Sequence, residues 1–181
     1  MAGRIAVVDT ANRFLRWTER SEIHEHRLLH RSVHVFIFDN EGRLILQQRA
    51  YDKDTWAGAW DLSCSGHIEE SDYLAGPDER LDEVYAQVAL RELEEELGLR
   101  AELGSLGRFG PEAGPWYEHL ELFIGRSDGP FVLQPEEVVA WRAVSRAELA
   151  TLARDQEVVL TSSLLTLSGL LQQRGLWPDG P

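Results

Sequence analysis

Residues 91–99 read RELEEELGL, and three glutamates in this stretch have a spacing with chemical meaning. Glu92, Glu95 and Glu96 stand at positions i, i+3 and i+4, so an α-helix would present all three on one side. Like charges at this spacing repel one another, and a hard divalent cation with oxygen ligands relieves that repulsion. The stretch therefore indicates either a metal site on a helix or an ordinary acidic face exposed to solvent.

A second pattern in the same region predicts the helix itself. Apolar residues recur at helical spacing before Gly98, a typical residue after a helix end. They are Ala86, Ala89, Leu90, Leu93 and Leu97. With 3.6 residues per turn, the three glutamates centre about 125° away from this apolar stripe. We therefore expect the stripe to pack on a sheet while the carboxylates point outward.

The acidic stretch dominates the charge of the chain. Of 181 residues, 31 are acidic and 18 basic, a net charge of −13, and residues 66–98 hold 11 of the acids against two arginines. Nucleic acids and anionic membrane surfaces bind cationic proteins, so neither is an expected partner. The single cysteine, Cys64, excludes an internal disulfide and fits a reducing compartment. Because we find no secretory signal and no apolar run of membrane length, we expect a cytoplasmic protein.

The residue order at 91–99 resembles the second half of the Nudix box, R-E-U-x-E-E-x-G-U, in which U is aliphatic. The first half, G-x5-E-x7, is matched only in pieces by Gly66, Asp72 and Glu83. Gly66 precedes Arg91 by 25 positions, 11 more than in the box, so an 11-residue insertion between positions 72 and 83 splits the motif. In the family the first acidic residue supports the box arginine. Asp72 and Glu83 are both candidates, and we favour Glu83 because it should lie near the helix start.

Further segments are similar to isopentenyl diphosphate isomerase and to the Nudix hydrolases related to it. They are residues 30–35 (HRSVHV), 46–49 (LQQR), 53–60 (KDTWAGAW) and 65–67 (SGH). In the isomerase, the arginine and lysine that match Arg49 and Lys53 contact the substrate diphosphate. The resemblance therefore implies that both residues bind a diphosphate here, although a surface salt bridge is the alternative for Lys53.

Two differences from the isomerase favour hydrolysis over isomerisation. The isomerase has a reactive cysteine where this chain has Ser65, and Cys64 lies one residue earlier. In a strand, a shift of one residue turns a side chain to the other face. The isomerase also lacks most of the Nudix carboxylates that this chain retains.

The resemblance implies Mg²⁺ or Mn²⁺ as the cofactor of a diphosphate hydrolase. The metal ligands would be Glu92, Glu95, Glu96 and the carbonyl of Ser65, completed by Glu118, Glu136 or Glu137. One glutamate of the helix or of a later loop would deprotonate the attacking water, and Arg91 would orient the carboxylates. His30, His67 and Glu118 also match part of the isomerase metal site, with His24 one residue off. These histidines either bind a second metal or make structural hydrogen bonds.

The expected substrate is a small organic diphosphate derived from a nucleoside. Besides Arg49 and Lys53, the residues expected to bind it are Trp60, His67 and Trp116. Trp56 and Tyr117 are further aromatic candidates for stacking on a base, and apolar packing is the alternative role for at least two of these aromatic residues. The insertion at 73–82 is interpreted either as a lid or selectivity element or as a passive surface loop. Three other functions stay open: diphosphate isomerisation, a non-catalytic Nudix-like domain that binds a nucleotide or protein, and a plain acidic interaction domain. A homodimer is also left open.

We expect a single domain over residues 1–181 with an α/β (α+β) Nudix fold, a mixed β-sheet sandwiched between α-helices. It would comprise an N-terminal edge segment (1–30), the split Nudix box (66–99) and C-terminal helices within 145–174. Strands are predicted at 5–9, 33–38, 44–48, 61–65, 100–109, 117–126, 131–133 and 138–144, and C-terminal helices at 146–154 and 160–174.

Overall fold

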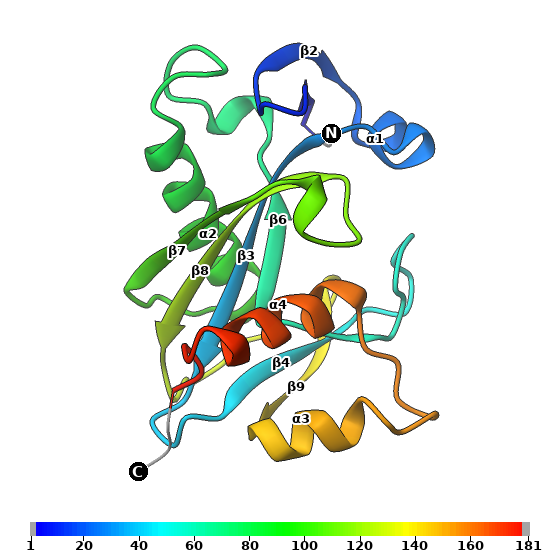
Figure 1. Ribbon diagram of the computed structural model, residues 1–181, viewed down its shortest axis with the longest axis vertical. Coiled ribbons are helices and arrows are strands. Elements are labelled where there is room, and N and C mark those ends of the chain that lie inside the picture. Colours follow the sequence, from blue (N-terminus) through cyan, green and yellow to red (C-terminus); the bar gives the residue numbers. More distant parts are fainter. Residues whose placement is uncertain (1–2, 179–181) are drawn as a thin grey trace.

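The computed structural model describes residues 3–178 and shows a mixed sheet between two layers of helices (Figure 1). The main sheet has seven strands in the order β5-β4-β3-β8-β7, with β6 also paired to β3 and β9 to β4. The strands are β3 (His30–Phe38), β4 (Leu44–Arg49), β5 (Trp60–Asp61), β6 (Cys64–His67), β7 (Leu103–Phe109), β8 (Glu118–Arg126) and β9 (Val138–Val144). This confirms the expected α/β class.

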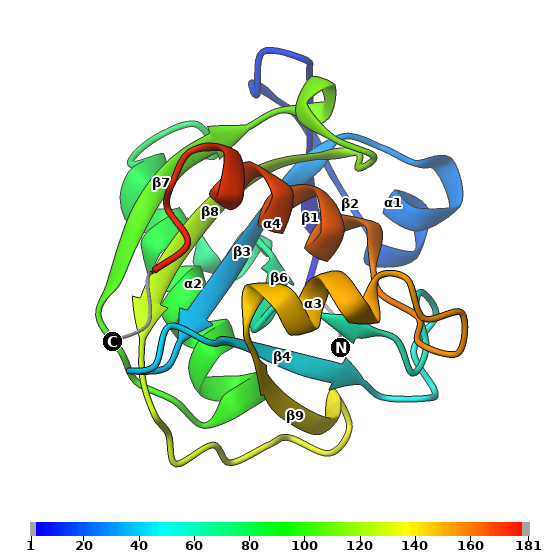
Figure 2. The ribbon, with the colours of Figure 1, turned by 60° about the horizontal axis from the view of Figure 1, so that its bottom comes forward.

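The helices α2 (Leu81–Leu97) and α4 (Ser162–Gln173) cover opposite faces of this sheet, and α3 (Arg146–Leu152) follows β9 (Figure 2). Ser145 and Glu148 form a capping box at the start of α3. Among the described residues, no helix combines the length and the apolar character needed to cross a membrane.

Strand β3 separates two apolar cores because its side chains alternate between the two faces of the sheet. Val33, Val35 and Ile37 belong to the core under α2, whereas Phe36 and Phe38 belong to the core under α4. The polar residues in the first half of the strand follow the same alternation. His30, Ser32 and His34 therefore lie on the α4 side of the sheet, and Ser32 and His34 line a cleft that begins where the apolar packing ends.

Helix α2 forms as predicted, but its buried stripe is rotated from the expected position. The residues that are buried on it are Val84, Tyr85, Val88, Ala89, Leu93, Glu96 and Leu97. Leu90 was placed on the stripe and is 45% exposed, which corrects the prediction. Glu92 follows Val88 by four residues and Glu96 follows Glu92 by four, so both glutamates continue the buried stripe and do not lie on the opposite side of the helix. The last two turns of the stripe thus carry carboxylates among its apolar residues.

The N-terminal segment folds as a unit of its own on the main sheet. β1 (Ile5–Val8) pairs antiparallel with β2 (Phe14–Thr18), and α1 (Arg20–His26) follows. Neither β2 nor α1 was predicted, because β2 has no buried apolar side chain and α1 has one, Ile23. The strand predicted at 131–133 is also wrong, since these residues run past the end of α2, where the Val132 amide donates to the Leu97 carbonyl (2.8 Å).

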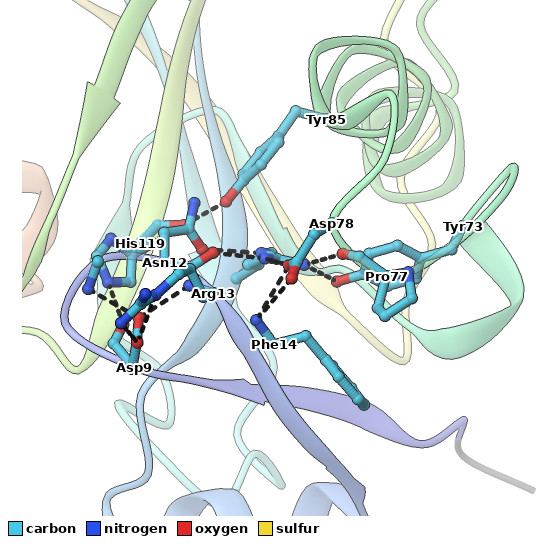
Figure 3. A network of polar contacts seen from close by, with 11 residues as sticks. Asp9, Asn12, Arg13, Phe14, Tyr73, Pro77, Asp78, Tyr85 and His119 are labelled. Atoms are coloured by element: carbon cyan, nitrogen blue, oxygen red, sulfur yellow. Dashed lines mark hydrogen bonds and ion pairs between the residues drawn. The ribbon is translucent and has the colours of Figure 1, made fainter.

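The insertion at 73–82 is anchored to the N-terminal unit, and the buried guanidinium of Arg31 on β3 takes part in this contact. Figure 3 shows Asp78 of the insertion beside Asn12 and Phe14 of the N-terminal unit. Arg31 donates to the Asp78 carboxylate (2.6 Å), to the Tyr73 hydroxyl (3.1 Å) and to the Pro77 carbonyl. Asp78 also accepts from the Phe14 amide of β2 (3.0 Å). No residue of the insertion lines the cleft described below, and its contacts in the described state are those of a structural brace.

Candidate active site

A cleft of about 850 Å³ opens where the sheet divides beside β3. β6 pairs with β3 at residues 32–35, whereas β4 pairs with it only at Phe38, so the two partners diverge. The cleft is lined from both branches and also from α1, α2, the start of β8 and the start of α4. All three helix glutamates, both predicted diphosphate ligands, Ser65, His67, Trp116 and Glu118 line it.

The glutamates of α2 differ in their surroundings. The side chains of Glu92 and Glu95 are 13% and 50% exposed, and Glu96 is 7% exposed. Burial, against the opposing charge of Arg91, raises the pKa of Glu92 to about 7. Burial and then the nearby Glu92 raise the pKa of Glu96 to about 8. A divalent cation beside these groups would supply the positive charge that their ionised forms lack.

The backbone of β6 is shaped to receive Glu92. A Cβ at position 66 would lie 2.0 Å from the Cδ atom of Glu92, so only glycine lets this carboxylate approach the strand so closely. Ser65, whose carbonyl is the predicted metal ligand, immediately precedes Gly66 and lines the same cleft. This close approach of a buried carboxylate to the strand fits an oxygen-ligated Mg²⁺ or Mn²⁺ site.

Arg91 organises the acidic side chains. Its guanidinium lies 3.0 Å from both Glu92 and Glu95 and 3.1 Å from Asp72. Glu83, the residue that the sequence favoured for the first acidic position, instead pairs with Arg80. That preference is wrong because two turns of helix separate Glu83 from Arg91, whereas Asp72 folds back over the helix in a short capping-box turn.

Among residues 3–178, the only three His, Cys, Asp or Glu side chains whose ligand atoms all lie within 4.8 Å of one another are His30, His67 and Glu118. The three helix glutamates are not gathered this tightly, since the Arg91 guanidinium lies between Glu92 and Glu95.

The histidine cluster has its own hydrogen-bond pattern. His30 Nδ1 lies 2.9 Å from the Leu28 carbonyl, and its buried Nε2, 3.8 Å from Glu118, has no hydrogen-bond partner. Glu118 accepts from Ser32 (2.6 Å) and contacts His34 Nε2 (3.1 Å).

The charges of this cluster suit a divalent cation. Burial would raise the pKa of Glu118, but the hydrogen bond from His34 and the neighbouring imidazoles hold it well below its usual range. Burial and then the charge of His30 hold the pKa of His67 well below its usual range, so His67 is neutral. A neutral imidazole and a carboxylate beside an unpartnered imidazole nitrogen are suitable ligands for a transition-metal ion.

Besides Arg91, three cationic side chains line the cleft. Arg49 donates from Nε and Nη2 to the Thr55 carbonyl (3.3 and 3.2 Å), and Lys53 pairs with Glu137. Arg20 was missed by the sequence analysis because α1 was not predicted. It is exposed at the cleft, and it makes no ion pair within the described part of the chain. Of the later glutamates, Glu118 and Glu137 line the cleft, whereas Glu136 does not.

The aromatic candidates separate into packed and accessible residues. Trp60, predicted to bind substrate, does not line the cleft: it packs on the core under α4, with the Arg142 guanidinium 3.9 Å from its ring centroid. Trp116 lines the cleft but is 6% exposed and donates its indole N–H to the Gly110 carbonyl (3.0 Å). Trp56 and Tyr117 line the cleft and are more accessible.

Cys64 is fully buried and faces away from the cleft. It lies opposite Val35 in the register of β6 with β3, within the core under α2. Ser65 takes the alternate face and lines the cleft. Burial raises the pKa of the Cys64 thiol well above its ordinary value, which makes it a poor nucleophile.

Comparison with known proteins relates this chain to Nudix proteins and to isopentenyl-diphosphate isomerases. The NUDIX domain family model matches residues 28–162. An isopentenyl-diphosphate Delta-isomerase of Serratia proteamaculans is 35% identical over 142 residues, covering 76% of this chain and 73% of the relative. An uncharacterized Nudix hydrolase of Pseudomonas aeruginosa is 38% identical over 150 residues, covering 81% and 80%.

Solved structures show the same fold. A Deinococcus radiodurans protein superposes with a TM-score of 0.72 at 20% identity, covering 94% of this chain and 98% of that one. The NUDIX domain of Shewanella oneidensis NrtR, solved in complex with ADP ribose, gives a TM-score of 0.59 at 19% identity, covering 87% of this chain and 99% of that one.

Proposed function

The chain belongs to the Nudix family, in the branch related to isopentenyl diphosphate isomerase, and on that premise we propose that it is a metal-dependent hydrolase of a small nucleoside-derived diphosphate. The observation that carries this proposal is that Glu92 and Glu96 line the cleft. Glu92 lies close against β6, which is possible only because Gly66 has no side chain. Buried carboxylates with raised pKa values are costly unless a ligand uses them.

The proposed metal ligands are Glu92, Glu95, Glu96 and the carbonyl of Ser65, with Glu118 or Glu137 completing the set. A Mg²⁺ or Mn²⁺ ion held there would neutralise the diphosphate and lower the pKa of a water molecule. Arg91 bridges Glu92 and Glu95 and so orients the carboxylates.

Other side chains of the cleft would bind the phosphates and deprotonate the water. Arg20 of α1, Arg49 at the end of β4 and Lys53 in the loop after β4 supply positive charge for the phosphate oxygens. Glu137 is a candidate base for the water, because it lines the cleft and its contact with Lys53 breaks when that lysine turns to a phosphate.

The experiment is a phosphate-release assay with Mg²⁺ or Mn²⁺ over nucleoside diphosphates, dinucleotides, nucleotide sugars and prenyl diphosphates. Glu95→Gln should abolish metal-dependent turnover, because it removes a charged ligand that is half-exposed and dispensable for folding. Glu94→Gln is the matched control, since Glu94 pairs with Arg100 on the helix surface. Equal activity of the two variants would contradict the metal assignment.

Isomerisation of isopentenyl diphosphate is the second candidate, favoured by the cluster of His30, His67 and Glu118. The burial of Cys64 disfavours it, because no thiol reaches the cleft. Incubation with isopentenyl diphosphate separates the two reactions. Appearance of the dimethylallyl isomer without phosphate release would replace the hydrolase proposal with the isomerase.

A further inference from the structure

The loop between β4 and β5 carries an aromatic side chain that neither the core nor the proposed phosphate chemistry uses. Trp56 lines the cleft and is 48% exposed. We propose that Trp56 is the platform on which the base of a nucleoside diphosphate stacks, and that it determines specificity for such substrates. This inference rests on the proposed diphosphate hydrolase, and it assigns the part of the substrate beyond the phosphates.

The backbone at Trp56 supports a functional role. Its φ angle is +55°, in the left-handed region that bulky residues avoid. Such conformations persist where the surrounding structure imposes them, often at ligand sites. Here the Trp56 carbonyl accepts from the Ala59 amide (3.1 Å), which closes a tight turn. A tryptophan at a position better suited to glycine is consistent with selection for its ring.

The same loop is tied to the proposed phosphate site. Arg49 donates two hydrogen bonds to the carbonyl of Thr55, the residue that precedes Trp56. The guanidinium that would bind the diphosphate therefore also fixes the peptide from which the indole projects. A substrate whose phosphates contact Arg49 would have its next group within the same cleft as Trp56.

Trp56 is the aromatic side chain in the cleft with the most accessible ring. The Arg27 guanidinium lies 3.9 Å from the ring centroid of Tyr117 and covers one face of that ring. Trp116 is nearly buried and its indole N–H is already bonded. Trp56 makes no ring pair with another aromatic residue and no cation–π contact among the described side chains.

The cleft as a whole suits a nucleobase better than a prenyl chain. A prenyl chain requires an enclosed apolar pocket, and a half-exposed tryptophan cannot enclose one. A base instead offers a flat face for stacking and polar edges for hydrogen bonds. Polar groups are available for those edges, because the partly exposed hydroxyl groups of Ser162 and Ser163 line the cleft at the start of α4.

The test compares two probes that share a non-hydrolysable diphosphate and differ in the nucleoside: α,β-methylene-ADP and methylenediphosphonate. Their affinities are measured by calorimetry in Mn²⁺ for the wild type and for Trp56→Ala, Trp56→Phe and Trp141→Ala. Trp141 is the matched control, since it is 42% exposed but does not line the cleft. Thermal melts confirm that each variant is folded.

We expect Trp56→Ala to weaken the binding of α,β-methylene-ADP by about tenfold, within the range found for loss of one base-stacking contact. The affinity for methylenediphosphonate should not change. Trp56→Phe should recover most of that loss, and Trp141→Ala should behave as the wild type. The inference is overturned if Trp56→Ala affects neither probe, or affects both equally through the loop. It is also overturned if the wild type binds the two probes with equal affinity, because the nucleoside then contributes nothing to binding. That result would leave the proposed diphosphate site intact. If the wild type binds neither probe in Mn²⁺, the proposed function fails as well.

Discussion

In the absence of a divalent cation, the buried carboxylate of Glu92 should make the protein less stable as the pH rises, and Glu92→Gln should remove this effect. Burial raises the pKa of Glu92 from 4.5 to about 7. Between these two values the folded state holds a proton that the unfolded chain has released. The free energy of unfolding therefore falls as the pH rises through this window.

The magnitude follows from the shift. A rise from 4.5 to about 7 corresponds to about 3 kcal/mol at about 1.36 kcal/mol per pKa unit. Glutamine imitates the protonated carboxyl group. At pH 8 in chelator, Glu92→Gln should therefore raise the free energy of unfolding by up to about 3 kcal/mol. At pH 4, where the carboxyl group is protonated in both states, the change should be within about 0.5 kcal/mol.

A bound cation should reverse the sign of the effect. A ligand at a thousandfold excess over its dissociation constant stabilises the folded state by about 4.1 kcal/mol, which exceeds the advantage of the variant in chelator. The wild type gains this from Mn²⁺, whereas the variant has lost a proposed ligand. At pH 8 the variant should thus be the more stable protein in EDTA and the less stable one in saturating Mn²⁺.

The assay is urea unfolding, monitored by tryptophan fluorescence, at pH 4, 6 and 8 in EDTA and in Mn²⁺. Glu94→Gln serves as the control, because Glu94 pairs with Arg100 at the surface and should show neither effect. If Glu92→Gln destabilises the protein in EDTA at pH 8, the reasoning from burial is refuted. If Mn²⁺ does not reverse the order of stability, Glu92 is not a metal ligand.

Three further variants test other parts of the structure. Gly66→Ala should weaken Mn²⁺ binding, measured by calorimetry, by at least about tenfold, because the added Cβ would meet the Glu92 carboxylate. Asp78→Ala should lower the free energy of unfolding by about 2 kcal/mol, because it leaves the buried Arg31 guanidinium without its carboxylate, and it should not change kcat/KM. Arg20→Ala should raise the KM for a diphosphate substrate with little change in kcat, as steady-state kinetics would show, because the charge binds substrate and transition state alike.

Asp78→Ala and Arg20→Ala each have a control in the same chain. Glu83→Ala removes an acid that pairs only with Arg80 at the surface, and it should change stability by less than about 0.5 kcal/mol. Arg16→Ala removes a cation that pairs with Glu22 outside the cleft, so its KM should be that of the wild type. Equal effects of Asp78→Ala and Glu83→Ala would contradict the bracing role of the insertion.

Much of the fold was predictable because its central elements have strong periodic patterns. The strands β3 and β4 and the helices α2 and α3 all lie where the sequence placed them. The parts that were missed have weak local patterns. β2 and α1 are held by contacts with distant residues, such as the bond from the Phe14 amide to Asp78, and the local sequence carries no sign of those contacts.

The candidate site was predictable in its membership but not in its geometry. Motif order indicated Glu92, Glu95, Glu96, Arg49 and Lys53, and all five line the cleft. Spacing alone could not show which acid reaches the box arginine, because the insertion changes the distance along the chain and not the distance in space. Trp60 was predicted to bind substrate and instead packs on the core. Its position beside a motif could not show this, because a tryptophan suits the core as well as a ligand site.

The alternation of β6 connects the fold to the choice between the two reactions. Along Cys64, Ser65 and Gly66, successive residues face the core under α2, the cleft, and then α2 again. The Cys64 thiol is thereby buried among apolar side chains. Ser65 occupies the position in the cleft that a reactive cysteine would need. On the α2 side, the missing side chain at Gly66 admits the Glu92 carboxylate. In the proposed function, the same three residues bury the thiol that an isomerase would use as its nucleophile and make room for a carboxylate that a hydrolase would use. This register is the reason why we propose hydrolysis although some relatives are named for isomerisation.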